Sequence, residues 1–136
     1  LVSPLQVGPN GAQVRSTERW FRFVFQPPFT QIRDVYFYMP DLVVPAEWTL
    51  LYGVTDTYRQ PSTAESVVAV APVPITKPAT PNIGGSPPME GPGPAYSQWV
   101  VLQATVTGDT PSGPLLGYDP LGEPRPLTYR VEWTEL

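Results

Sequence analysis

Apolar and polar residues alternate along much of the chain, which is the pattern of β-strands that bury one face of a sheet. Near the N-terminus, phenylalanine occupies every second position of residues 21–25. The alternation predicts strands over residues 19–25, 32–39, 48–55, 65–71, 96–107 and 127–134. Strands at irregular spacing, separated by turn residues, favour a single antiparallel β-sandwich domain over residues 1–136.

Each predicted strand has one better apolar face, which we assign to the core. These inward residues are Phe21, Phe23 and Phe25, then Val35, Phe37 and Met39, then Trp48, Leu50, Tyr52 and Val54, then Val100, Leu102, Ala104 and Val106, and finally Leu127, Tyr129, Val131 and Trp133. The opposite faces mix polar and aromatic residues: Trp20, Arg22 and Val24, then Asp34, Tyr36 and Tyr38, then Trp99, Val101, Gln103 and Thr105, and finally Thr128, Arg130, Glu132 and Thr134.

Proline and glycine reinforce the all-β prediction. The chain has 20 prolines and 11 glycines in 136 residues, and proline inside a helix costs about 3 kcal/mol, so long helices are excluded. Many of them fall in residues 72–94, with eight prolines and four glycines, and in a second loop over 108–126. We expect residues 72–94 to form a stiff, extended excursion with no core of its own, and both loops to carry partner contacts.

The residue inventory excludes several kinds of chemistry. The chain has no cysteine and no histidine, so disulfides, Cys/His zinc sites and Ser-His-Asp hydrolysis are ruled out. A net charge of −4 argues against nucleic-acid binding, and no apolar run reaches the length of a membrane-spanning helix. The N-terminus lacks an initiator methionine and a signal-peptide pattern, so we expect it to be processed or trimmed.

Candidate catalytic residues are few. The carboxylates considered for a two-acid hydrolase are scattered along the chain with no pairing in their spacing: Asp34, Glu47, Asp56, Glu132 and Glu135. Residues 84–86 fail as a phosphate loop because two prolines follow them, and no calcium-binding array of acids occurs. We therefore expect no enzyme activity, no metal and no cofactor.

Outward aromatic residues are the best candidates for a binding surface. Trp20, Tyr36, Tyr38 and Trp99 lie opposite the better apolar faces, and Trp, Tyr and Arg are enriched where protein partners dock. Two alternatives stay open: both faces are partly buried or covered by the long loops, or the rings form a platform for sugars. The loop residues Pro87, Pro88 and Tyr118 complete the candidate contacts.

The C-terminal third resembles a known type of domain. Residues 99–106, the turn Thr110-Pro111-Ser112-Gly113 and residues 127–133 are similar to the last two strands of immunoglobulin-like β-sandwiches in small virion proteins of tailed bacteriophages, especially capsid decoration (head auxiliary) proteins. The loop 108–126 is longer than the tight turn expected there.

The resemblance implies a non-enzymatic structural protein at the virion surface. It would bind the major capsid protein and copies of itself, commonly as a homotrimer, and stabilise the outside of an assembled head. The alternative is an adhesive or carbohydrate-binding β-sandwich module of a tail or cell-surface protein. The outward aromatic residues suggest this alternative.

Overall fold

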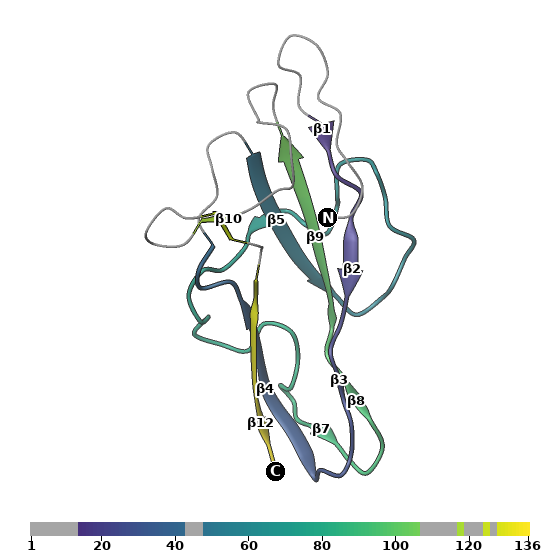
Figure 1. The fold of residues 1–136 in the computed structure, drawn as a ribbon. Helices are drawn as coiled ribbons and strands as arrows, with labels where there is room; N and C mark the ends of the chain where they lie inside the picture. Colours follow the sequence, from purple (N-terminus) through teal and green to yellow (C-terminus); the bar gives the residue numbers. More distant parts are fainter. Residues whose placement is uncertain (1–13, 43–47, 107–116, 119–123, 126–127) are drawn as a thin grey trace.

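Two antiparallel sheets form the body of the molecule (Figure 1). The computed structural model describes residues 14–42, 48–106, 117–118, 124–125 and 128–136. The larger sheet, here the β9 sheet, contains β1 (Val14–Arg15), β2 (Arg19–Phe21), β9 (Trp99–Val106), β5 (Trp48–Thr55) and β6 (Ala71–Pro72). The β4 sheet contains β12 (Arg130–Glu135), β4 (Gln31–Tyr38) and β7 (Met89–Glu90). The predicted all-β class is confirmed for the described residues.

Two shorter pairs complete the strands: β3 (Val24–Phe25) with β8 (Ala95–Tyr96), and β10 (Gly117–Tyr118) with β11 (Pro124–Arg125). The predicted strand 19–25 is thus divided between β2 and β3. Phe21 pairs with Val100 but Val24 pairs with Tyr96, so three steps on one strand face four on the other. Such an extra residue interrupts the ladder as a bulge does.

Ser97 bridges that interruption. Its hydroxyl accepts a hydrogen bond from the backbone N–H of Phe23 at 2.9 Å, and its own N–H donates to the Phe23 carbonyl at 2.9 Å. The backbone groups of Phe23 are therefore satisfied although the regular ladder stops there.

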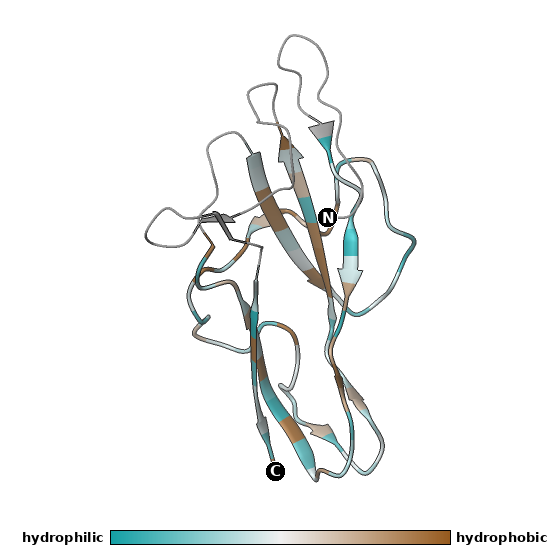
Figure 2. Ribbon diagram, in the orientation of Figure 1, coloured by the Kyte–Doolittle hydropathy of each residue, from teal (hydrophilic) through white to brown (hydrophobic). Residues whose placement is uncertain are grey.

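The hydrophobic core lies between the two sheets. Ile32, Val35 and Phe37 of β4 pack in one cluster with residues of β5 and β9, among them Leu50 and Val100. In Figure 2 the apolar residues recur at intervals along these strands. The predicted inward positions of Val35, Phe37 and Met39 are confirmed, since all are buried.

Alternation also located most strand limits. The predicted strand 48–55 coincides with β5, and β4 begins and ends one residue before the predicted 32–39. The last strand differs more: β12 covers Arg130–Glu135, and Tyr129 and Trp133 are 54 % and 45 % exposed. Their predicted burial is wrong because β12 is an edge strand of the β4 sheet.

The predicted strand 65–71 is wrong except at its last residue, which opens β6. The Ser66 hydroxyl accepts hydrogen bonds from the N–H groups of Val68 and Ala69, at 3.1 and 2.8 Å. A serine that binds nearby backbone in this way offers the chain an alternative to a sheet ladder. Val67 and Val70 consequently point to solvent, 80 % and 65 % exposed.

The segment 56–70 covers the outer face of the β9 sheet. Figure 1 shows it passing around β2 and returning across the sheet to β6. It lies so close that a Cβ added at Gly53 would collide with the Val68 carbonyl. Val101 and Gln103, predicted on an open face, are 0 % and 4 % exposed. The alternative that both faces are partly buried is confirmed here, but the covering segment is 56–70 and not one of the two long loops.

The proline-rich excursion 72–94 is an integral part of the fold. It has no separate core in the described chain, as predicted, but Val73 and Ile83 are buried in the main cluster. The Asn82 side chain accepts from the Phe37 N–H at 2.7 Å and donates to its carbonyl at 2.8 Å, and β7 pairs with β4. These bonds fix the excursion along one edge of β4.

Most of the predicted loop 108–126 lies outside the described residues, apart from β10 and β11. In the described part of the chain no helix is long and apolar enough to cross a membrane.

Candidate functional site

Trp20 and Trp99 meet on the outer face of the β9 sheet. Trp20 of β2 pairs with Val101 of β9, so Trp99, two residues earlier, is its diagonal neighbour on the same face. Their ring centroids lie 6.3 Å apart with an edge-on geometry. Antiparallel pairing thus joins two residues that are far apart in the sequence.

Tyr58 adds a third ring to this pair. β5 ends at Thr55, opposite Trp99, and the bend at residues 56–57 returns the chain over the sheet. The Tyr58 ring lies 4.9 Å from Trp99 and 5.4 Å from Trp20 between centroids, and its residue is 52 % exposed. The three rings form one cluster open to solvent on one side.

Two arginines lie over these rings. The Arg22 guanidinium carbon is 4.3 Å from the Tyr96 centroid and 4.6 Å from that of Trp99, and the Arg59 guanidinium carbon is 5.2 Å from Trp20. A guanidinium stacked by its face keeps its N–H donors at the edge for other partners. The group formed by Trp20, Arg22, Tyr58, Arg59, Tyr96 and Trp99 is called the aromatic–arginine patch below.

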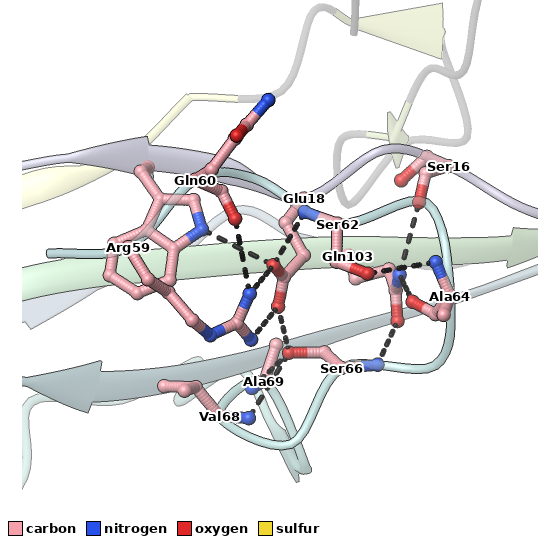
Figure 3. A network of polar contacts seen from close by, with 11 residues as sticks. Ser16, Glu18, Arg59, Gln60, Ser62, Ala64, Ser66, Val68, Ala69 and Gln103 are labelled. Atoms are coloured by element: carbon pink, nitrogen blue, oxygen red, sulfur yellow. Dashed lines mark hydrogen bonds and ion pairs between the residues drawn. The ribbon is translucent and has the colours of Figure 1, made fainter.

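A buried carboxylate holds Arg59 in place (Figure 3). The side chain of Glu18 is fully buried, and it binds the two Arg59 amino nitrogens at 2.7 and 2.9 Å. It also accepts hydrogen bonds from the Ser62 N–H at 2.9 Å, the Trp20 indole N–H at 3.4 Å and the Ser66 hydroxyl. One carboxylate therefore anchors both an arginine and a tryptophan of the patch.

The electrostatics of Glu18 follow from these contacts. Burial alone raises the pKa of a carboxyl group, but the hydrogen bonds from Arg59, Ser66, the Ser62 backbone and Trp20 outweigh it and lower the pKa of Glu18 from 4.5 to about 2. The carboxylate is charged at neutral pH and is matched by the Arg59 cation.

Gln103 extends this network under the segment 56–70. Its side-chain oxygen accepts from the Ser66 N–H at 2.9 Å, and its amide nitrogen donates to the carbonyls of Ser16 at 3.1 Å and Ala64 at 2.7 Å. Since Gln103 lies on β9 and Ser66 also binds Glu18, the covering segment is tied to the sheet by buried polar bonds. The patch is built on a fixed base.

Tyr36 and Tyr38 belong to a different surface, on the β4 sheet. The Lys77 ammonium is 4.4 Å from the Tyr36 ring centroid and 3.7 Å from a Glu132 carboxylate oxygen. The Tyr38 hydroxyl donates to Glu132, and this bond together with Lys77 lowers the pKa of Glu132. Tyr38 is only 6 % exposed, so its predicted place on an open face is wrong.

The remaining predicted contacts do not join the patch. Pro87 and Pro88 are exposed in the turn before β7. Tyr118 lies in β10, and its side chain falls outside the described residues. The four outward aromatics thus divide into a pair within the patch and a pair on the β4 sheet.

The candidate acids form no recognisable catalytic group in the described chain. Asp56 accepts from the Gln98 amide at 2.9 Å, and Glu132 is bound to Tyr38 and Lys77. Glu47 lies outside the described residues. Within the described ranges, no three Asp or Glu residues gather where they could hold a metal ion.

Sequence reasoning missed four residues of the patch, Arg22, Tyr58, Arg59 and Tyr96, and also the buried anchor Glu18. Arg22 could have been found, because it lies two residues after Trp20 and so on the same strand face. Tyr58 and Glu18 depend on the path of the segment 56–70, where the alternation over 65–71 predicts a strand that the structure shows only at its last residue.

Comparison with known proteins adds no relative: no family model, curated protein or solved structure matches this chain.

Proposed function

We propose that this chain is a non-enzymatic binding protein that attaches to another protein through the aromatic–arginine patch. The observation that carries the proposal is the pre-organised cluster of Trp20, Tyr58 and Trp99, with Arg22 lying over the Trp99 ring. Rigid aromatic side chains and arginine dominate the binding energy of protein interfaces, and groups already held in place lose little conformational entropy on binding.

The proposed partner comes from the sequence resemblance: the outer surface of an assembled bacteriophage head, made of the major capsid protein. A protein that binds the shell but not its separated subunits stabilises the shell by mass action, without chemistry. The corresponding proposal for the fold is an immunoglobulin-like sandwich whose last strand, β12, has joined the sheet opposite β9. Two antiparallel sheets around a shared core support it.

The test has two steps. Purified particles of the source virus should contain the chain in stoichiometric copy number, and recombinant chain should rebind particles from which it has been stripped. Arg22→Ala and Tyr58→Ala should each weaken rebinding by at least about thirtyfold, the loss of one interface hot spot. Ile75→Ser, a change at a 54 % exposed apolar residue outside the patch, is the control. Absence from particles, or rebinding by both patch variants at wild-type strength, would refute the proposal.

Carbohydrate binding is the second candidate. Tyr58 is half exposed. Asp56 follows Thr55 and Gln98 precedes Trp99, where these two residues pair at the end of β5, and the Gln98 amide donates to the Asp56 carboxylate at 2.9 Å. Aromatic faces beside amide and carboxylate groups suit a sugar ring. A glycan array separates the two candidates: a lectin should bind glycans and lose that binding in Tyr58→Ala, whereas the protein-binding function predicts no glycan binding by wild type.

A further inference from the structure

The last strand, β12, presents an open edge. It pairs with β4 on one side, and no strand of the described chain pairs with its other side. Tyr129 and Trp133 are about half exposed on the face toward the core, where Tyr129 lies 5.5 Å from Phe23 and Trp133 lies 5.2 Å from Phe25 between ring centroids. Aromatic area and unpaired backbone thus coincide along one edge, a combination that favours pairing with another strand.

Alternate residues of β12 direct their backbone N–H and C=O groups toward β4 and away from it. Leu136 exchanges both backbone bonds with Gln31, and the backbone of Phe37 is turned away from β12 toward Asn82. In an antiparallel ladder these directions alternate. The register shifts between Glu132, which faces Tyr36, and Thr134, which faces Arg33, so the extra residue lies on β4 and the alternation along β12 is unbroken. Residues 130, 132 and 134 therefore bond to β4, and Tyr129, Val131 and Trp133 direct their N–H and C=O groups at the open edge.

The sequence of this edge is complementary to itself when reversed. Residues 128–134 read Thr-Tyr-Arg-Val-Glu-Trp-Thr. Around Val131, arginine at 130 mirrors glutamate at 132, tyrosine at 129 mirrors tryptophan at 133, and threonines mirror each other at the ends. An antiparallel pair of two such strands would place opposite charges and aromatic partners directly across from each other.

We propose that β12 pairs antiparallel with β12 of a second copy of this chain, around a two-fold axis at Val131. Arg130 would face the partner's Glu132, and Tyr129 would face the partner's Trp133. The two β4 sheets would become one continuous sheet, and the half-exposed rings would be covered from the side. This two-fold pair is independent of the proposed function, since it uses none of the patch.

The neighbouring two-fold registers fit less well. A two-fold axis perpendicular to the sheet must pass midway between the two copies of one residue, so that residues on the same face meet. An axis at Glu132 would set two glutamates against each other, and one at Trp133 would set Val131 against the partner's Glu135. With the axis at Val131, the outward N–H and C=O groups of residues 129, 131 and 133 face those of residues 133, 131 and 129 of the second copy. Arg130 is exposed and makes no ion pair in the described chain. Glu132 already accepts from Tyr38 and lies 3.7 Å from Lys77, so the partner's Arg130 would add to these contacts.

Charge reversal tests this register. Arg130→Glu alone, or Glu132→Arg alone, places like charges across both symmetric positions, so each should weaken self-association by about tenfold or more. Mixed in equal amounts, the two variants should form a heterodimer, because every facing pair is then opposite in charge. Light scattering or analytical ultracentrifugation measures the mass, and far-UV circular dichroism with a thermal melt verifies that each variant is folded.

A cysteine scan gives a second, independent readout, because the chain has no native cysteine. A hydrogen-bonded antiparallel pair has its Cα atoms about 5.5 Å apart, within the span of a disulfide. Val131→Cys should therefore cross-link to a dimer under mild oxidation. In the matched control Thr134→Cys, the two sulfurs would be separated by roughly six residues, or about 20 Å along the strands, and no cross-link should form.

The outcomes are distinct. A wild-type dimer, a heterodimer from the two charge variants and a cross-link at 131 but not at 134 support the proposal. A wild-type monomer, a trimer of the kind the phage resemblance implies, or cross-linking at both positions would overturn it. Tyr58→Ala, which tests the proposed function, should leave the dimer intact.

Discussion

At the scale of single residues, Glu18 has the most demanding environment among the described carboxylates. It is buried beside β9, yet it is charged, because Arg59, Ser62, Ser66 and Trp20 all donate to it. Removing one partner of a buried ion pair leaves the other without compensation. The structural role of Glu18 is therefore inseparable from the positions of Arg59 and Trp20 in the patch.

Glu18→Gln should lower the free energy of unfolding at pH 7 by about 2 kcal/mol, the range for hydrogen bonds to a charged group. Urea denaturation measures the change. Glu65→Gln is the matched control: its side chain is 79 % exposed and its only described ion pair, with Arg15, spans 3.8 Å, so its effect should stay within about 0.5 kcal/mol. Equal losses in the two variants would contradict the assigned role.

A fall in pH should reduce the free energy of unfolding of the wild type more than that of the Glu18→Gln variant. The pKa of Glu18 is about 2 in the fold against an ordinary 4.5. A carboxyl group with a lowered pKa stabilises the fold above its unfolded pKa and loses that contribution as pH falls toward the folded value. The contribution is on the order of 3 kcal/mol, lost between about pH 5 and 2. If the free energy of unfolding fell equally with pH in the two proteins over this range, the lowered pKa of Glu18 would be contradicted.

At the scale of elements, the segment 56–70 and the excursion 72–94 are both fixed to the sheets by short-range contacts. The first is packed on Gly53 and bound through Ser66 and Gln103. The second is bound through Asn82 and contributes Ile83 to the core. Neither is a free loop, although the segment 56–70 contains no strand and the excursion contains only β7 and the last residue of β6.

Gly53→Ala should destabilise the fold by about 1–3 kcal/mol, the cost of forcing extra volume into a packed site. The new Cβ would collide with the backbone carbonyl of Val68, which no side-chain rotation relieves. Chemical denaturation gives the size of the loss. Gly93→Ala provides the comparison, because an added Cβ there meets no atom within 4 Å; a similar cost at both positions would argue against close packing of this segment.

Asn82→Ala should release the excursion. Phe37 would lose partners for both its N–H and its C=O, at a cost of roughly 1–3 kcal/mol. Limited proteolysis followed by mass spectrometry should show faster cleavage within 72–94 than in wild type. The control Thr80→Ala, at an exposed residue two positions away, should be cleaved at the wild-type rate. Unchanged cleavage of Asn82→Ala would show that other contacts hold the excursion.

Strand positions were predictable to the extent that alternation alone defines them. The pattern over 48–55 located β5 completely, because alternate residues of this strand, beginning with Trp48 and Leu50, face the hydrophobic core. The same logic failed at 65–71, where the hydroxyl of Ser66 competes with the ladder. It also missed that Gln103 is buried, since only the three-dimensional path of 56–70 covers that face. Trp20 and Trp99 were identified as candidates, but their meeting depends on register, which a single strand does not encode.

At the scale of the whole molecule, the two sheets share one core, with Phe37 at their junction. Its ring lies 5.9 Å from Phe21, 6.2 Å from Tyr52 and 5.8 Å from Tyr129 between centroids. These neighbours come from β2, from β5 and from the residue that precedes β12. Loss of this ring therefore affects contacts on both sides of the core.

Phe37→Ala should cost about 3–5 kcal/mol, and both sheets should lose it together. Hydrogen exchange of amides in β4 and β9 should report the same reduced opening free energy, and denaturation should remain one transition. Val24→Ala, at a 45 % exposed residue of β3, should have a much smaller effect. Separate transitions for the two sheets would show that they unfold as independent units.

The polar network around Gln103 also favours one alignment of the strands. Strand side chains alternate between faces, so sliding β9 by one residue against β2 and β5 would turn Gln103 toward the core and Ala104 toward Glu18 and Ser66. An amide would then be buried among Val35 and Phe37 without partners, and the Ser66 and Ala64 backbone groups that it now binds would lose theirs. A misaligned sheet is thereby penalised twice, once in each layer. Gln103 and Trp99 thus favour the observed register of a strand whose other residues are mostly valine, alanine and threonine.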